Sequence, residues 1–251
     1  MGGSAGLGQR FNRVEVTLKG GVDRTVYQQS TFTDGTTASN ADRDYDRYFG
    51  ELRASYELMP GVKPFIETGA DRRAHDLAID RSGVRRDSDG RYVKGGTTFE
   101  LERTLTGDVA LGYVERRYED PTLPTISGVT FDSSLTWLAS ALTVMKLTAR
   151  TTVDETILIG VAGAFTREVA LQIDHSFRRW LMATLKISGA SVDYVGSPRQ
   201  DERYATSGLL TYKLTREVWL KAEYRHEWRH SNVAGNDYQA DVVLVGARLQ
   251  R

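Results

Sequence analysis

Two stretches of this sequence carry charged side chains at every second or nearly every second position. Side chains two residues apart in a β-strand project from the same face, so this spacing predicts strands with one charged face. The candidate residues are Arg47, Glu51 and Arg53 in the first stretch and Lys221, Glu223, Arg225, Glu227 and Arg229 in the second.

The chemistry of such a face depends on what it encloses. Facing water in a lumen, mixed charges would favour the passage of anionic or zwitterionic solutes. Facing one another in a filled lumen, the same charges would pair across strands and leave no continuous water path. The sequence leaves both interpretations open.

Histidines are the remaining candidates for chemistry, and none sits in a catalytic pattern. His175 lies between Asp174 and Ser176, but adjacent strand residues point to opposite faces, so the three cannot form one site. His226 and His230 lie near a loop without a carboxylate at a convincing spacing, and His75 begins another loop. Because no nucleophile motif, metal-ligand cluster or phosphate loop is present, we expect no enzyme activity and no metal or cofactor.

These charged residues belong to a longer rhythm of alternating apolar and polar positions, clearest at 14–26. Such alternation predicts strands with one apolar face, and segments of this kind repeat to the end of the chain. We expect about twelve strands, an even number as in most bacterial outer-membrane barrels. The expected ranges are 14–26, 47–58, 64–73, 93–101, 109–118, 131–139, 143–149, 157–177, 181–187, 204–214, 218–228 and 238–249.

Connections between the expected strands are alternately short and long. MPG, ERTLTGD, FRRW and TRE are short, whereas polar stretches such as QQSTFTDGTTASNADRD are long. Short periplasmic turns and long outer loops are typical of transmembrane β-barrels. The pattern therefore predicts an all-β, up-and-down antiparallel transmembrane barrel with both termini periplasmic, and a soluble barrel or sandwich is the alternative.

Composition and the two ends of the chain add further expectations. The 33 Lys and Arg residues balance 33 Asp and Glu residues, which argues against a nucleic-acid partner. Residues 1–12 are rich in small side chains, and we interpret them as a flexible tail or a vector-derived remnant. Residues 13–251 are expected to form one outer-membrane barrel.

Tryptophans fall near the expected strand ends. Trp137, Trp180 and Trp219 lie close to short turns, and Trp228 lies near a long loop. Two girdles of interfacial aromatic residues would give this distribution, although aromatic residues favour strands in general.

Several segments in the middle of the chain resemble a known family. PFIETGADRR, RRDSDG, GYVERRYEDPTLPTISGVTFDSSLTWLASALT, the DET of VDET and DHSFRRWL occur in the order found in the proteobacterial outer-membrane β-barrels called putative β-barrel porin type 2. The resemblance implies the outer membrane of a Gram-negative bacterium. Through the association of such proteins with surface-polysaccharide genes, it also implies a role in export or envelope assembly. It implies no reaction.

We therefore expect a narrow passive channel, or the barrel component of a polysaccharide-export or envelope-assembly system. Loops as long as 28–44 can fold inward and constrict the lumen. A structural or adhesion-like barrel acting through its extracellular loops is the competing function, and an outer-membrane hydrolase is a third. The expected partners are outer-membrane lipids and periplasmic or polysaccharide-export proteins.

Overall fold

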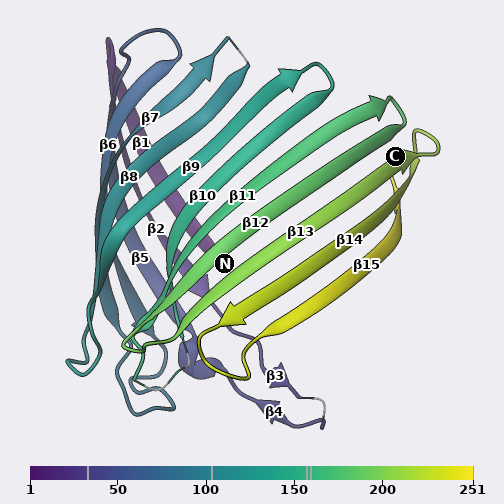
Figure 1. Cartoon of the computed structure of the whole chain (residues 1–251). Coiled ribbons are helices and arrows are strands. Elements are labelled where there is room, and N and C mark those ends of the chain that lie inside the picture. Colours follow the sequence, from purple (N-terminus) through teal and green to yellow (C-terminus); the bar gives the residue numbers. More distant parts are fainter. Residues whose placement is uncertain (33, 103, 157, 159, 251) are drawn as a thin grey trace.

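A computed structural model describes residues 1–32, 34–102, 104–156, 158 and 160–250. Thirteen strands form one sheet in which each strand pairs with its sequence neighbours, antiparallel throughout (Figure 1). These strands are β1 (Gly2–Phe11), β2 (Val14–Thr25), β5 (Tyr45–Tyr56), β6 (Val62–His75), β7 (Ser88–Leu101), β8 (Leu105–Tyr118), β9 (Ile126–Ser140), β10 (Thr143–Asp154), β11 (Gly163–Arg178), β12 (Leu181–Val195), β13 (Gln200–Lys213), β14 (Val218–Ser231) and β15 (Tyr238–Leu249).

The connection between β2 and β5 holds the remaining elements. They are a two-stranded hairpin, β3 (Ser30–Thr31) with β4 (Thr37–Ala38), and the 3-10 turn η1 (Ala41–Arg43). None of the helical segments in the described part of the chain has the length and apolar character needed to cross a membrane.

Short connections lie at one end of the sheet, which we call the turn end, and the longest connections lie at the other, the loop end. The turn between β5 and β6 depends on glycine, because Gly61 has a φ of 79°. A Cβ there would also lie 2.1 Å from the carbonyl oxygen of Glu100. The predicted MPG turn is therefore confirmed.

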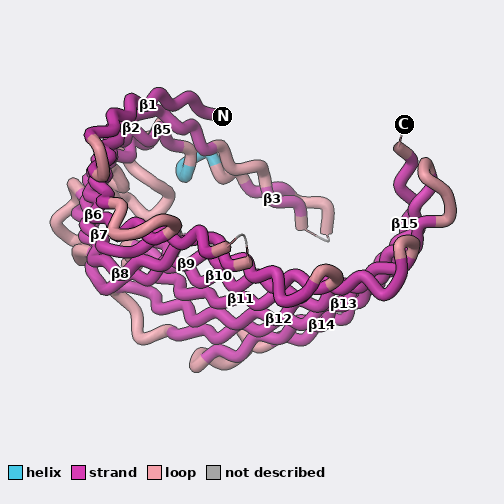
Figure 2. Tube along the Cα trace, turned by 90° about the horizontal axis from the view of Figure 1, so that it is seen from above, coloured by secondary structure: helices cyan, strands magenta, loops and turns pink. Residues whose placement is uncertain are grey.

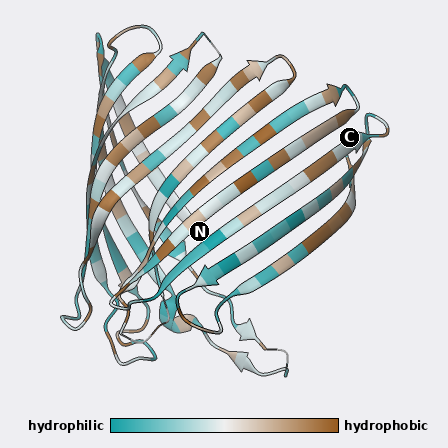
Figure 3. Cartoon of the chain, viewed as in Figure 1, coloured by the Kyte–Doolittle hydropathy of each residue, from teal (hydrophilic) through white to brown (hydrophobic). Residues whose placement is uncertain are grey.

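One face of the sheet is apolar across its strands. Leu135 pairs with Leu147, Leu147 with Leu171, and Leu171 with Ile187, so four strands place an apolar side chain in one row. Ile187 is 48% exposed. Figure 3 shows the apolar and polar positions alternating along individual strands. This outer face has the character required for contact with lipid, and the opposite face carries the charges.

The sheet curves into an open arc when it is viewed end-on (Figure 2). In the described part of the chain, β1 and β15 are its two edge strands. With an odd number of antiparallel strands, these edges run in the same direction. Gly2 is paired with Asp23 at the loop end, whereas Leu249 is paired with Val218 at the turn end.

One prediction is wrong at the N-terminal side. Residues 1–12 are not a flexible tail, because Gly2 to Phe11 form β1 in register with β2. Glycine and alanine have low β-propensity, so the sequence pattern missed a strand that the backbone of β2 holds in place. The additional strand raises the number of strands in the sheet to thirteen.

The start of the expected strand 157–177 also differs. Ile157 and Ile159 lie outside the described residues, and β11 begins at Gly163. Val161 instead lies in the connection after β10, where it is 3% exposed. Close by, Leu123, Ile126, Ala162 and Phe165 form a small buried cluster. This cluster fixes the connection after β10 against the loop ends of β8 and β9.

Candidate functional site: a charged lumen and its loop cluster

The charged face of β5 to β8 is a lattice of ion pairs that run from strand to strand. Arg53 lies 3.3 Å from Glu67 on β6, and Lys94 on β7 lies 3.1 Å from the same carboxylate. Nearer the loop end, Asp71 lies 2.6 Å from the Arg116 guanidinium. Each carboxylate therefore bridges cations from two strands or more.

The predicted residues Arg47 and Glu51 border this lattice. Arg47 lies 3.6 Å from Asp71 and 3.7 Å from Asp23, and Glu51 faces the same cavity. The cavity has a volume of about 590 Å³ and is open toward the concave side of the sheet. Arg150 on β10 also lines the cavity. Unlike the other cations of the lining, Arg150 has no carboxylate within 4.0 Å in the described part of the chain. The cavity can therefore contact a small charged solute.

The second predicted set, on β14, lies on the same face of the sheet. Arg225 lies 3.0 Å from Glu227 on its own strand. Arg229 pairs with Asp201 of β13, whose side chain is fully buried. Asp201 also accepts hydrogen bonds from Arg199 and from the Tyr194 hydroxyl at 2.9 Å. These residues pair within the wall, as the filled-lumen interpretation requires.

Lys221 and Glu223 differ from these neighbours on β14. They pair in register with Thr211 and Leu209, and neither has an ion pair among the residues that the structure describes. They are the members of the predicted β14 set whose charges remain free to meet a solute.

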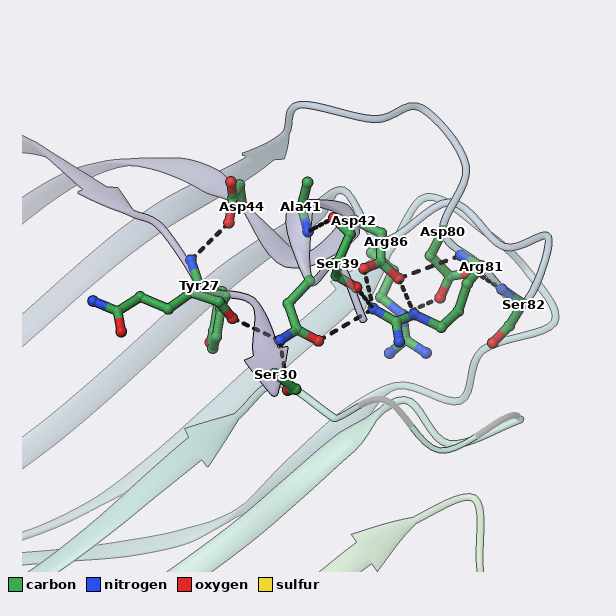
Figure 4. A network of polar contacts seen from close by, with 12 residues as sticks. Tyr27, Ser30, Ser39, Ala41, Asp42, Asp44, Asp80, Arg81, Ser82 and Arg86 are labelled. Carbon is green, nitrogen blue, oxygen red and sulfur yellow. Dashed lines mark hydrogen bonds and ion pairs between the residues drawn. The ribbon is translucent and has the colours of Figure 1, made fainter. Parts of the chain in front are cut away.

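Long connections from three parts of the chain meet above this wall, and we call their contact the loop cluster. Its members are Asp42, Arg43, Asp80, Arg81, Arg86 and Glu155. Figure 4 shows Arg81 reaching from the β6–β7 connection to Asp42 in η1. Arg81 also donates to the carbonyl oxygen of Ser39 at 2.8 Å.

Arg86 joins the β6–β7 connection to the connection after β10. Its Nε lies 2.7 Å from Asp80, and its Nη1 donates to the carbonyl oxygens of Val161 and Ala162 at 3.1 and 3.3 Å. Arg86 and Asp80 are both buried, with side chains 5% and 7% exposed. A buried guanidinium with this many partners holds two loops together strongly, because losing one partner leaves an unpaired charge.

Asp80 organises its own loop. One of its carboxylate oxygens accepts hydrogen bonds from the backbone amides of Ser82 and Val84 at 2.7 and 3.1 Å. Burial raises the pKa of Asp80, but the hydrogen bonds from Arg86 and these amides outweigh burial and hold the pKa below its usual value. The pKa of Asp42 is lowered by its hydrogen bond from Arg81. Both residues are therefore carboxylates at neutral pH.

A buried ion pair fastens the loop cluster to the sheet. Arg73 of β6 lies 2.5 Å from Glu155, and its Nη2 donates to the carbonyl oxygen of Val153 at 3.2 Å. The Arg73 and Glu155 side chains are 11% and 3% exposed. Because Arg73 lies on the charged face, this pair draws the connection after β10 over the concave side.

The tryptophans occupy both faces. Trp137 and Trp180 are 48% and 46% exposed near the turn end, and Trp228 stacks on Tyr204 with centroids 5.4 Å apart nearer the loop end. Trp219 departs from the expected girdle: two residues before Lys221, it shares the charged face. The Lys213 ammonium lies 4.5 Å from its ring centroid.

His175 lies on the outer face, where its Nδ1 is 2.8 Å from the Thr143 hydroxyl. Asp174 points to the opposite face and accepts a hydrogen bond from Thr184 at 2.6 Å. The two side chains therefore do not form one site. In the part of the chain that the structure describes, no three His, Cys, Asp or Glu side chains come together as a metal site.

Sequence reasoning missed Arg73, Asp80, Arg86 and Glu155. Asp80 and Arg86 lie in the arginine-rich, acidic stretch DRSGVRRDSDG, Glu155 is the carboxylate of VDET, and Arg73 ends the expected strand 64–73. Contacts between separate connections leave no periodic pattern, so the sequence does not show that these side chains meet.

The family comparison bears on the whole chain. Residues 1–251 match the model of the family described as "Putative beta-barrel porin 2". The chain belongs to this family. No curated protein matches it in sequence.

Solved structures support the same fold. The outer membrane channel DcaP of Acinetobacter baumannii is 13% identical with a TM-score of 0.53, and the alignment covers 98% of this chain and 83% of that one. The FrpB iron transporter of Neisseria meningitidis is 9% identical (TM-score 0.53), with 92% of this chain and 44% of that chain covered.

The outer membrane transporter YddB of Escherichia coli is 10% identical (TM-score 0.51), with 92% and 42% covered. The chain thus spans less than half the length of these two transporters. At such low identity these likenesses establish the fold alone. Family and fold together confirm an outer-membrane β-barrel of a Gram-negative bacterium.

Proposed function

We propose that this porin-family barrel is a passive channel for small charged solutes, narrowed at its loop end by the loop cluster. The observation that carries the proposal is the buried pair between Arg73 and Glu155. It ties a long connection to the wall of a charged cavity of about 590 Å³. The ion pairs of the wall leave few free charges, so selectivity between anions and cations should be weak.

The residues that line the cavity indicate which class of solute the channel passes. Arg150 offers a cation without a carboxylate partner in the described residues, and Glu51 and Asp132 lie on the same cavity. A small zwitterion can satisfy both signs at once, whereas a large neutral sugar cannot pass a narrowed opening. We propose no catalytic role, because the wall carboxylates Glu67 and Asp71 are held in ion pairs with arginine and lysine.

The test is the swelling of liposomes that contain the refolded protein. We expect slow swelling in glycine, none above the protein-free rate in a trisaccharide, and faster glycine swelling for Glu155→Gln, which loses the charge that holds Arg73. Glu217→Gln, at the turn end, is the matched control and should behave as wild type. Equal rates for wild type and Glu155→Gln, or no glycine swelling for either, would contradict the proposal.

Two other functions predict different outcomes. A barrel component of a polysaccharide exporter should pass the trisaccharide after Glu155→Gln, because its lumen must accommodate a sugar chain. A structural or adhesion-like barrel should pass neither solute in either form.

A further inference from the structure

His75 occupies an unusual position at the base of the loop cluster. It is the last residue of β6, and its side chain is 1% exposed. Neither ring nitrogen has a hydrogen-bond partner among the described residues. Nδ1 lies 3.4 Å from the Asp87 carboxylate, and the ring centroid lies 5.3 Å from that of Tyr45.

The space beside His75 is small and its walls are charged. His75 lines a cavity of about 10 Å³ with residues from three loops, so no solute fits there. The charged groups around the imidazole are Arg73 on its own strand, Asp87 on the following connection, and the six members of the loop cluster, Asp42, Arg43, Asp80, Arg81, Arg86 and Glu155.

The surrounding carboxylates are already engaged. Asp87 accepts a hydrogen bond from the backbone amide of His75 at 2.7 Å, and Glu155 is paired with Arg73. Asp80 is bonded to Arg86 and Asp42 to Arg81. A proton on the imidazole would add a further buried cation to a chamber that already contains four arginines.

A neutral imidazole suits this chamber, and an imidazolium does not. Burying an additional charge costs several kcal/mol in general, and Asp87, 3.4 Å from Nδ1 and already bonded to the His75 amide, offsets only part of that cost. Separating the loops instead lets water reach the ring. Histidine is also the side chain that titrates nearest to neutral pH.

We propose that His75 is a pH-sensitive latch: its neutral ring keeps the three loops closed over the lumen, and protonation releases them. The consequence for permeation rests on the proposed channel function, but the release of the loops does not.

The expected size of the pH effect follows from the coupling between protonation of His75 and opening of the loops. A closed chamber that admits only the neutral ring loses stability relative to the open loops as pH falls below about 6.5, the ordinary pKa of histidine. The open-to-closed ratio should then rise about tenfold between pH 7.5 and pH 5.5. Asp42 and Asp80 do not contribute in this range, because their pKa values lie below the ordinary value of about 3.9.

A single thiol can report the opening, since the chain contains no cysteine. Ser82 is a suitable site because its Oγ is buried in the β6–β7 connection. The labelling rate of Ser82→Cys with a maleimide is divided by that of Ala234→Cys, an exposed position in the β14–β15 connection, which cancels the intrinsic pH dependence of the thiol. This ratio should rise about tenfold from pH 7.5 to 5.5.

Variants of two histidines test whether His75 is the group that responds to pH. With His75→Gln the ratio should be independent of pH, and with His230→Gln, an exposed histidine beside Asp237, it should change as in wild type. If His75→Gln does not fold, His75→Phe fills the same space without a charge and should give the same flat profile.

A wild-type ratio that does not change, a His75→Gln profile equal to wild type, or a profile flattened by His230→Gln would each overturn the latch. Glycine swelling measured at both pH values separates the two proposals. A labelling change without a swelling change supports the latch and contradicts the narrowed channel.

Discussion

A pair of adjacent residues on β12 tests which face of the sheet meets lipid. Ile187 is 48% exposed in the apolar row with Leu171, whereas Ser188 is half-buried on the charged face between Ala170 and Ala205. We change each residue to arginine. Both variants introduce the same side chain one position apart in the same strand. A difference in stability between them therefore reports the face of the sheet and not the backbone conformation.

The expected costs differ because the two side chains enter different media. Ile187 lies at the middle of β12, and an arginine facing lipid near the midplane costs about 2–4 kcal/mol. Ser188→Arg should cost less than about 1 kcal/mol, since charged changes facing the lumen are tolerated and Glu168 and Glu227 lie nearby on the same face.

The assay is denaturant titration of protein folded into lipid vesicles, followed by tryptophan fluorescence. The difference in the free energy of unfolding between the two variants should be at least about 1 kcal/mol, with Ile187→Arg the less stable. Equal costs, or a larger cost for Ser188→Arg, would refute the assignment of the outer face.

Three further changes probe the turn, the wall and the loops. Gly61→Ala should destabilise the barrel by more than about 1 kcal/mol because of its positive φ and the nearby Glu100 carbonyl, while Gly50→Ala, where a Cβ meets no atom within 4 Å, should be near neutral in the same titration. Arg116→Ala should cost about 3 kcal/mol or more, because it leaves the buried Asp71 carboxylate without its closest partner; recovery of stability in the double variant Arg116→Ala/Asp71→Asn would support this cause, and no recovery would count against it. The pKa values of Asp42 and Asp80 are lowered, so their contribution to loop closure is present above about pH 4 and lost as pH falls through the lowered values; in a His75→Gln background, Ser82→Cys labelling should therefore stay slow at pH 5 and rise below about pH 4, and a rise already at pH 5 would contradict it.

The alternation of residue types was sufficient to predict most of the sheet. The ranges expected for β5, β8, β13, β14 and β15 lie close to the observed strands, because one face of each strand must suit lipid and the other water. The pattern fails where this constraint is absent. β1 carries glycine, alanine and serine at most positions, so its place in the sheet is determined by backbone hydrogen bonds to β2.

The site was only partly predictable for a similar reason. Strand periodicity identified the charged face, including Arg53 and Arg229, but not the ion partners on neighbouring strands such as Glu67 and Asp201. Those partners depend on the register between strands. The loop cluster depends on contacts between residues up to 82 positions apart, which no local pattern encodes.

The central claim is that a charged lumen is narrowed by loops held to its wall. Single-channel recording of the refolded wild-type protein in a planar bilayer at pH 7.5 tests this claim most directly. The account predicts small, brief conductance steps that become larger when Glu155 is replaced by Gln. Large, steady steps from the unmodified protein would contradict it and indicate an open pore.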